Sequence, residues 1–269
     1  MFSRILRLSK TFFSLIGLVS TFAFVLIIAL FIFRPKNIET ENTLVVGTAS
    51  GYAPFCSITP DGECKGFDVD IAHDLANQLE KKLVLEDLGS MNTLFLALEQ
   101  GTIDCVIWGL SITQSRMKKV AMVPYAGEHT TAYKMLFWQR IPEGISSIAD
   151  MKNMTVCVEA GSSQEAVLDR YPSVSKKTMN SVTDALFALQ QGCCDALLVE
   201  PAIAYGFKEK LPEHIKSIDL PLAPEDQVFG IGIAIKKDNT ALIESIKKAI
   251  DAMKKNCKLE SAQARWGVY

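Results

Sequence analysis

The chain has 269 residues, of which 49% are hydrophobic and 22% charged, so it is long enough for one large or two small domains. The first 36 residues hold five of the 28 basic residues and none of the 30 acidic ones, which leaves 23 basic against 30 acidic side chains in the remainder. A net charge of −7 on that remainder argues against nucleic acid as a partner.

The apolar segment near the start predicts a membrane-associated leader. Residues 11–33 carry no charge, and 23 residues at about 1.5 Å each span a hydrocarbon core of roughly 30 Å. Arg4, Arg7 and Lys10 precede the segment, an arrangement that sends the rest of the chain out of the cytoplasm. Because the apolar run ends in LFIFRPK without a small-residue cleavage pattern, we favour an uncleaved anchor over residues 1–36, with a long cleaved signal as the alternative.

Short apolar runs then alternate with helical periodicity. The first half of the pattern predicts strands at residues 43–49, 82–88, 103–112 and 131–139, and helices at 67–82 and 91–101 and around Arg116. We expect Asp68 to cap the helix at 67–82.

The same alternation of strand and helix patterns begins again near residue 150. It predicts strands at residues 154–160, 194–200 and 228–237, and helices at 162–171, 182–192, 201–210 and 241–256. Strands alternating with helices argue for parallel α/β sheets, and the restart argues for two lobes. In such sheets ligands bind at the carboxyl ends of the strands.

The first corner between a strand and a helix holds Arg116. Thr113 is a suitable N-cap, which makes Arg116 the third helical residue, with its side chain leaning back over Gly109 and Ser111. A cation at the positive end of a helix needs an anion beside it, and a guanidinium offers a planar fork for a carboxylate. A solvated surface arginine is the alternative.

The second corner lies in residues 158–167. Gly161 permits a tight turn, Ser162 is a suitable N-cap, and free N–H groups around Ser163 and Gln164 make an anion site. Glu165 has an ordinary structural explanation, because Ser162 and Glu165 have the spacing of a capping box.

The third corner is Glu200, which ends an apolar strand before Pro201 starts a helix. A carboxylate there needs a cation or water, and a bound ammonium would serve, although a surface acid at a helix start is also favourable. An α-amino acid carries both groups. Arg116 with the Ser163 amide would take its carboxylate, and Glu200 its ammonium.

Seven cysteines in an exported chain predict some disulfides and at least one remaining thiol. Cys56 and Cys64 flank a turn, and a hairpin centred near Pro60 would bring them opposite each other, so we expect a bridge between them. No spacing of Cys and His indicates a zinc site, and we expect no cofactor. Three further cysteines in apolar settings are expected to be buried thiols: Cys105, Cys157 and Cys257.

Six segments, in this order over residues 43–269, resemble the type II periplasmic solute-binding proteins of family 3, which deliver polar amino acids to ABC importers. The segments are GTASGYAPFCS, GECKGFDVDIAHDLA, IDCVIWGLSITQSR, VPYAGE, VEAGSSQE and DALLVEPAIAYG. LAPEDQVFGIGIAI and GEHTTAYKMLF look most like members that bind arginine. The resemblance implies an α/β fold of two lobes, joined by two crossing strands, that closes over its ligand like a hinge.

The resemblance also implies the organisation of the chain. Lobe 1 would comprise residues 43–132 and 229–269, lobe 2 residues 133–228, and the anchor would precede them. The protein would be a monomer in the periplasm, held to the inner membrane by its N-terminal helix, with an amino acid and an ABC permease as partners. If the leader is cleaved, the protein would be free in the periplasm.

By resemblance, Tyr52 covers the ligand side chain, Gly109 and Ser111 contact the amino-acid head, and Glu200 stands where the family usually has Asp for the α-ammonium group. The residues that we expect around the ligand are Tyr52, Met91, Trp108, Gly109, Ser111, Arg116, Glu159, Ser162, Ser163, Gln164 and Glu200.

Three positions depart from the family pattern and leave the ligand's identity open. Ala49 is often acidic in relatives, Met91 often Phe, and Trp108 usually small. Glu159 lies where relatives contact the ligand side chain, so a cationic or amide-bearing side chain is plausible, with Tyr52 and Trp108 stacking on a guanidinium. Core filling is the alternative explanation of Trp108.

Two other functions compete with amino-acid binding. Cyclohexadienyl dehydratases resemble this family closely and use a catalytic Glu at the place of Glu165, but plain binding members carry the same residue, so we expect no enzyme. A receptor sensor module is the second alternative, and it would have to signal through a partner.

Overall fold

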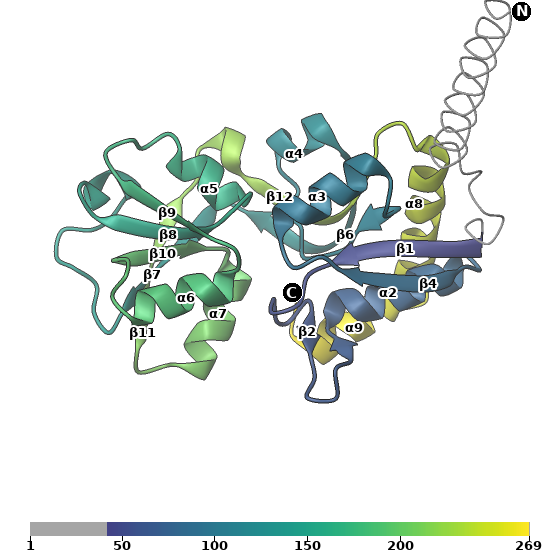
Figure 1. Ribbon diagram of the computed structural model, residues 1–269, viewed down its shortest axis with the longest axis horizontal. Coiled ribbons are helices and arrows are strands. Elements are labelled where there is room, and N and C mark those ends of the chain that lie inside the picture. The colour runs from purple at the N-terminus through teal and green to yellow at the C-terminus, as the bar shows by residue number, and fades with distance from the viewer. Residues whose placement is uncertain (1–41, 269) are drawn as a thin grey trace, which may run out of the picture. The chain divides into compact units, whose positions relative to one another are not determined.

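In a computed structural model, the described residues are 42–268 (Figure 1). The elements of the first lobe are β1 (Thr43–Thr48), β2 (Ser57–Ile58), β3 (Cys64–Lys65), α2 (Phe67–Gln78), β4 (Lys82–Asp87), α3 (Met91–Gln100), β5 (Cys105–Val106), α4 (Gln114–Lys119), β6 (Ala121–Thr130), β12 (Val228–Ile235), α8 (Thr240–Lys255) and α9 (Lys258–Trp266). Those of the second are β7 (Ala132–Trp138), η2 (Ile148–Met151), β8 (Thr155–Glu159), α5 (Ser163–Leu168), β9 (Ser175–Met179), α6 (Val182–Gln190), β10 (Ala196–Val199), α7 (Pro201–Lys210), β11 (Ile215–Pro221) and η3 (Pro224–Asp226).

Each lobe is built on a five-stranded sheet. The strand order is β4-β1-β5-β12-β6 in the first lobe and β11-β7-β10-β8-β9 in the second, and β2 and β3 form a separate hairpin. The expectation of purely parallel sheets is wrong. β12 runs antiparallel to β5 and β6, and β7 runs antiparallel to β10 and β11, because these strands lie where the chain passes between the sheets.

The helices follow from apolar faces and caps. In α2 the side chains of Ile71, Ala72 and Leu75 are fully buried, as their helical spacing predicts. Helix α3 begins at Ser90, whose hydroxyl accepts from the Thr93 amide, and ends at Gly101 in the left-handed conformation.

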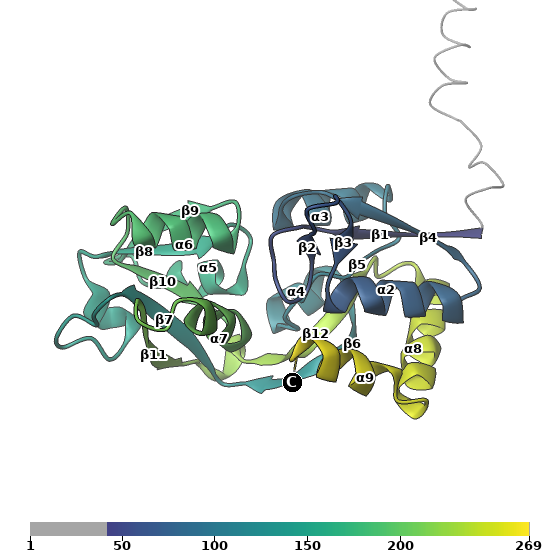
Figure 2. The same ribbon diagram turned by 90° about the horizontal axis from the view of Figure 1, so that it is seen from below.

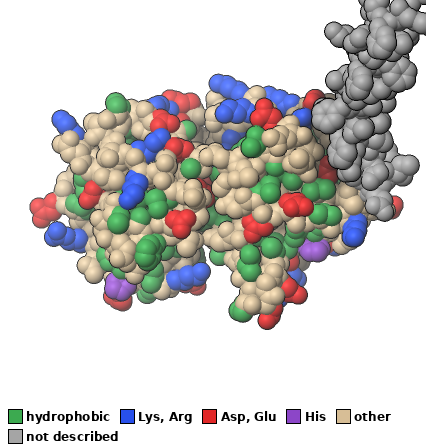
Figure 3. All heavy atoms as spheres, in the orientation of Figure 1, with side chains coloured by type: hydrophobic (Ala, Val, Ile, Leu, Met, Phe, Trp, Pro, Cys, Tyr) green, Lys and Arg blue, Asp and Glu red, His purple; other side chains and the backbone are tan. Residues whose placement is uncertain are grey.

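Cations and anions occur on both lobes of the face in Figure 3, with no single-sign surface of the kind that binds nucleic acid.

The predicted membrane anchor lies outside the described residues. Within residues 42–268, none of the helices combines the length and the apolar character needed to cross a bilayer.

Two segments pass between the sheets, one from β6 to β7 and one from β11 to β12 (Figure 2). β6 and β12 pair with each other, and their register is irregular around Gly230. Gly230 has a φ of 80° and lies so close to β6 that a Cβ atom there would be 2.8 Å from the carbonyl oxygen of Ala126. Only glycine allows the strands to meet in this way.

The predicted disulfide between Cys56 and Cys64 is absent, and both thiols are free. The hairpin register pairs Cys64 with Ile58, so Cys56 lies two residues further along its strand instead of opposite Cys64. Cys105 and Cys157 are buried thiols as expected, but Cys257 is exposed because it lies between α8 and α9.

Candidate functional site

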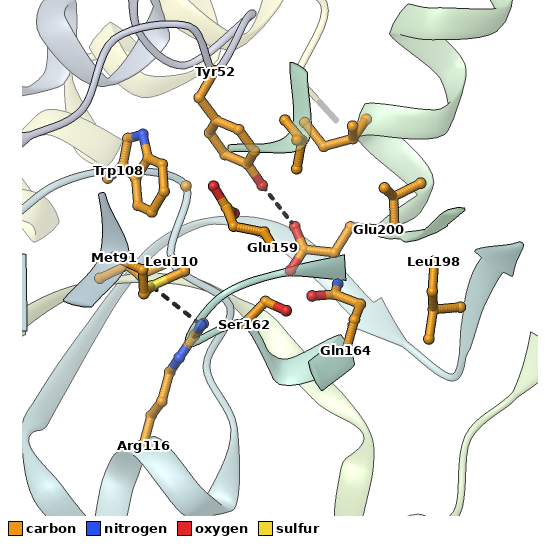
Figure 4. Close-up of a pocket in the computed structure, with 14 residues that line it drawn as sticks. Tyr52, Met91, Trp108, Leu110, Arg116, Glu159, Ser162, Gln164, Leu198 and Glu200 are labelled. Carbon is orange, nitrogen blue, oxygen red and sulfur yellow. Dashed lines mark hydrogen bonds between the residues drawn. The ribbon is translucent and has the colours of Figure 1, made fainter. Parts of the chain in front are cut away.

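The two lobes enclose a narrow cavity lined by residues from both (Figure 4). The first lobe contributes Tyr52, Met91, Trp108, Gly109, Leu110 and Arg116. The second contributes Glu159, Ser162, Gln164, Val182, Leu198, Val199, Glu200 and Ile203. Of the residues predicted from the sequence, Ser111 and Ser163 lie outside this lining.

Strand ends position the acidic residues of the cavity. Glu159 is the last residue of β8, and Glu200 follows β10 directly as the N-cap residue of α7. β8 and β10 are parallel neighbours, so their carboxyl ends lie at the same edge of the second sheet. The two carboxylates therefore enter the cavity side by side.

Arg116 is a buried cation in the first lobe. The Thr113 hydroxyl accepts from the Arg116 amide, which confirms the predicted cap. The guanidinium leans back as expected, with Nη1 donating to the Ser111 carbonyl oxygen at 3.0 Å and Nη2 to the Met91 sulfur at 3.5 Å. Burial lowers its pKa, and it forms no ion pair with a carboxylate of residues 42–268. This cation therefore has room for an anionic partner.

Glu200 reaches across from the second lobe to the first. Its side chain does not cap α7. Instead Oε2 accepts from the Tyr52 hydroxyl at 3.1 Å, and Oε1 accepts from the Ser111 hydroxyl. A solvated acid at a helix start would do neither. The carboxylate thus connects the two lobes across the cavity, and Ser111 belongs to the site through this contact.

Glu159 is a buried carboxylate whose Oε1 atom has no hydrogen-bond partner among the described residues. Its side chain is 5% exposed and lies beside Glu200 (Figure 4). Burial, followed by repulsion from Glu200, raises the pKa of Glu159 to about 8, although Arg116 acts in the opposite direction. The indole Nε1 of Trp108 is likewise buried without a partner in the described part of the chain. Both groups belong to residues that line the cavity, where a polar ligand could pair with them.

The charges of the cavity do not balance. When all three groups are ionised, Arg116 supplies one positive charge and Glu159 and Glu200 supply two negative charges. A ligand with a net charge of about +1 would neutralise this cavity. Around them, the rings of Tyr52 and Trp108 lie 5.0 Å apart and form an aromatic wall.

Gly109 is required by the shape of that wall. Its φ is 53°, and a Cβ atom there would lie 2.9 Å from the Phe55 ring and 3.0 Å from the Tyr52 ring. Any side chain would push these rings away.

Asp68 accepts a hydrogen bond from the backbone of Gly109. The expectation that it caps α2 is wrong. The N-cap position is taken by Gly66, and Asp68 lies within the first turn. Its buried carboxylate accepts from the Gly109 amide and, at 2.6 Å, from the Tyr125 hydroxyl. Burial raises the pKa of Asp68 to about 7, against the effect of these two hydrogen bonds. Asp68 therefore positions the loop that carries the cavity's first-lobe residues.

Replacing Asp68 by alanine leaves two buried donors unpaired, and we expect it to lower the free energy of unfolding by about 2–5 kcal/mol. Asp68→Asn should retain most of the stability, because its amide can accept from Gly109 and donate to Tyr125.

The raised pKa means that Asp68 binds a proton more tightly in the folded state, so its stabilising contribution is lost as pH rises from about 4 to about 7. Urea unfolding at pH 5 and pH 8 measures this loss. An unchanged pH dependence in Asp68→Asn would contradict the assignment.

The protein's own side chains already form several hydrogen bonds at the start of α5. Ser162 caps the helix by accepting from the Glu165 amide, as predicted. The Ser163 hydroxyl is engaged with Tyr133 at 2.7 Å, outside the cavity lining. Glu165 completes no capping box, because its carboxylate accepts from the Gly161 amide at 2.7 Å and pairs with Lys176 at 3.0 Å. It therefore has a structural role at the turn.

Sequence reasoning missed the supporting role of Asp68 and the apolar part of the cavity wall. An acid directly after Phe67, at the buried start of a predicted helix, was a usable signal for Asp68. The apolar residues Leu110, Val182, Leu198 and Ile203 look like ordinary core residues, and no pattern distinguishes them. Among residues 42–268, no cluster of three or more His, Cys, Asp or Glu side chains could hold a metal ion.

Comparison with known proteins places the chain among binding proteins. Residues 44–269 match the family of bacterial extracellular solute-binding proteins, family 3. The probable ABC transporter arginine-binding protein ArtJ of Chlamydia trachomatis serovar D is 33% identical over 232 residues, which cover 86% of this chain and 88% of that protein.

Solved structures agree on the two-lobed fold. An ancestral arginine-binding protein bound to glutamine aligns with a TM-score of 0.73 and 29% identity, over 84% of this chain and 97% of that one. The ancestral amino acid-binding protein AncCDT-1, a precursor of cyclohexadienyl dehydratase, aligns with a TM-score of 0.71 and 26% identity, over 85% of this chain and 96% of the other.

Proposed function

Because the chain belongs to the bacterial extracellular solute-binding proteins of family 3, we propose that it binds a basic, arginine-like L-amino acid outside the cytoplasm and delivers it to an ABC import permease. The observation that carries the proposal is the charge of the cavity. One buried cation without an ion-pair partner in residues 42–268 faces two carboxylates, one of them with an unsatisfied oxygen.

Each group of a basic amino acid has a counterpart in the cavity. The α-carboxylate pairs with Arg116, assisted by the backbone amide of Ser163, which lies outside this lining but borders an adjoining cavity together with Arg116. The α-ammonium pairs with Glu200, and the cationic side chain pairs with Glu159 and stacks against Tyr52. This assignment neutralises all three charges and gives the Glu159 oxygen the donor that it lacks.

The energies require contacts from both lobes. A micromolar ligand needs about 8 kcal/mol, whereas a charged hydrogen bond contributes roughly 1.5–3 kcal/mol, from which the cost of ordering the ligand is subtracted. Arg116 belongs to the first lobe, and Glu159 and Glu200 to the second. Binding therefore favours a closed state, with bending where β6 and β12 pass between the sheets, next to Gly230.

The relatives support the biological setting. The Chlamydia trachomatis protein is described as an arginine-binding protein of an ABC transporter. By analogy, the partner of our protein is the permease of such a transporter, and its place is the periplasm, at the inner membrane if residues 1–36 stay attached. We expect it to act as a monomer.

The geometry does not favour the dehydratase alternative, although one structural neighbour is a precursor of that enzyme. The acid that this alternative requires, Glu165, lines an adjoining cavity instead of the one that holds Glu159 and Glu200, and its carboxylate is already engaged by Gly161 and Lys176. A general acid must reach the reacting atom. Incubation with prephenate should therefore yield no phenylpyruvate.

Calorimetry on the full-length chain in detergent tests the proposal with the twenty L-amino acids and two analogues. We expect L-arginine or L-lysine to bind most tightly. L-citrulline has a neutral ureido group and should bind more weakly, because Glu159 loses its cationic partner. Agmatine lacks the α-carboxylate and should fail to bind. The absence of heat with every amino acid, in folded protein, would refute the proposal.

A further inference from the structure

A second cavity adjoins the first cavity, the one that holds Glu159 and Glu200. Its volume is about 970 Å³, and residues of both lobes line it. Helices α3 and α4 and the segment after β12 contribute from the first lobe, and α5 with the turn before it contributes from the second. Arg116 and Ser162 line both cavities. Because small-molecule sites have volumes of roughly 300–1,000 Å³, the second cavity is large enough to hold part of a ligand.

The second cavity borders only one end of the proposed ligand. Arg116, which we assign to the α-carboxylate, lines both cavities. Glu200 and Glu159, which we assign to the α-ammonium group and the side chain, line the first cavity and not the second. In Figure 4 the Arg116 side chain enters the first cavity from the end opposite to Tyr52. A longer ligand therefore has space beyond its carboxyl carbon, whereas its α-nitrogen faces Glu200 inside the first cavity.

Lysine side chains at the second cavity are available for an anion. Lys119 on α4 and Lys236 after β12 line it, and neither forms an ion pair with a carboxylate of residues 42–268. Lys119 follows Arg116 by three residues on α4. Residues with this spacing are neighbours on the surface of a helix, with Cβ atoms about 5–6 Å apart. A cation without a partner therefore lies one helical turn beyond the guanidinium.

The acids of the second cavity do not neutralise these lysines directly. Four acids belong to the lining: Glu99, Glu165, Asp169 and Asp238. Glu165 and Asp169 both pair with Lys176 on β9, and within residues 42–268 none of the four forms an ion pair with a lysine of the lining. An external carboxylate would therefore not have to break an existing ion pair of Lys119.

We propose that the second cavity binds the C-terminal residue of a dipeptide whose N-terminal residue, a basic L-amino acid, occupies the first cavity. This rests on the proposed function, because Glu200 keeps the α-ammonium group and Glu159 the cationic side chain. The peptide carbonyl oxygen accepts from Arg116. The terminal carboxylate lies one residue further, about 3.5 Å along an extended chain, and pairs with Lys119.

The apolar part of the lining favours a small apolar second residue. Phe95 and Leu98 come from α3, Val120 follows α4, and Ala166 lies on α5. Leu98 and Val120 are buried, and Phe95 is half-buried. A methyl or isopropyl side chain would bury apolar surface against them, whereas a charged one would lose water without gaining a partner.

Calorimetry on the full-length chain in detergent compares L-arginine with two dipeptides. We expect L-arginyl-L-alanine to bind within about tenfold of L-arginine, because a pair with Lys119 replaces the carboxylate pair with Arg116. L-alanyl-L-arginine should fail to bind, because its extension lies on the α-nitrogen, next to Glu200. Mass spectrometry of the ligand released from the complex should show the intact dipeptide. Recovery of free arginine alone would overturn the proposal.

Replacing Lys119 by alanine separates the two cavities. Affinity for L-arginyl-L-alanine should fall by about 3- to 10-fold, a partly exposed charge pair being lost, while affinity for L-arginine stays within about twofold. L-argininamide has no carboxylate and should be insensitive to the change. Lys118→Ala is the matched control, because Lys118 is the neighbouring exposed lysine on α4 and lies outside the lining of the second cavity. It should bind all three ligands normally.

The outcomes distinguish this proposal from the proposed function. Binding of L-arginine without binding of L-arginyl-L-alanine would refute the dipeptide site and leave the amino-acid site in place. Binding of the dipeptide without binding of L-arginine would contradict the amino acid as ligand and support the second cavity. Equal affinity for the two dipeptides, or an equal loss of L-arginine and L-arginyl-L-alanine binding in Lys119→Ala, would show that the second cavity does not hold the C-terminal residue.

Discussion

Replacing Arg116 by alanine is expected to weaken binding of the proposed basic amino acid by roughly 150- to 5,000-fold, equivalent to about 3–5 kcal/mol. The reason is that the ligand carboxylate would lie in a water-poor cavity without its cation. Calorimetry with L-arginine measures the loss.

The stability of the empty protein separates a binding role from a structural one. Arg116 is buried with only a carbonyl oxygen and a thioether as hydrogen-bond acceptors, so its charge is poorly compensated before ligand binds. We therefore expect Arg116→Ala to unfold at the same urea concentration as the unmodified protein, or a higher one. Arg265, an exposed arginine paired with Asp70, is the matched control, and Arg265→Ala should bind normally. Undiminished binding in Arg116→Ala would disprove the assignment.

Neutralising Glu159 is expected to remove the preference for a cationic side chain. In Glu159→Gln, affinity for L-arginine should fall by about 10- to 150-fold, equivalent to roughly 1.5–3 kcal/mol, because a charged hydrogen bond is lost. Affinity for L-citrulline should stay constant or rise, because a neutral amide can pair with a ureido group. Glu244→Gln is the control, since that exposed acid on α8 pairs with Lys247 and lies outside the cavity lining. Equal losses of affinity for L-arginine and L-citrulline would show that Glu159 does not recognise the charge of the ligand side chain.

The same carboxylate makes binding depend on pH. With a pKa of about 8, Glu159 is mostly protonated in the empty protein at pH 7, and a cationic ligand favours its ionised form. Binding should therefore release a proton, and affinity for L-arginine should increase as pH rises from 6 to 8. Titrations in buffers with different ionisation enthalpies count the proton. Glu159→Gln should release none at this position, and proton release of the same size in that variant would contradict the assignment.

Order and spacing of motifs predicted most of the site. The corners at Arg116, at residues 158–167 and at Glu200 could be found because a strand end followed by a helix start is recognisable in sequence, whereas Glu159 was expected only from the family resemblance. The structure brings Arg116, Glu159 and Glu200 to one cavity. What could not be read is how the charges are compensated. Nothing local shows that Glu159 lacks a partner while Glu200 is bonded to Tyr52, because both states depend on side chains from distant segments.

The elements that escaped prediction share a physical cause. β9 is an edge strand whose residues Ser175 and Lys176 are exposed, so it has no apolar run. β6 is also an edge strand, and Pro124 and Gly127 within it suggest a loop. The strand predicted at residues 103–112 is reduced to Cys105–Val106, because the backbone turns at Gly109. Each depends on tertiary pairing more than on local pattern.

The reach of Glu200 has a consequence for the apparent affinity for ligand. This side chain accepts hydrogen bonds from the hydroxyls of Tyr52 and Ser111 on the opposite lobe, so these hydroxyls take the place that a ligand ammonium group would occupy beside Glu200. A ligand must displace these two hydroxyls from Glu200 before it can bind. Its apparent affinity is therefore reduced in proportion to the fraction of molecules that are open. A Glu at this position reaches one methylene further than an Asp. The longer side chain would thus lower the affinity for ligand and raise the population of closed molecules that hold no ligand.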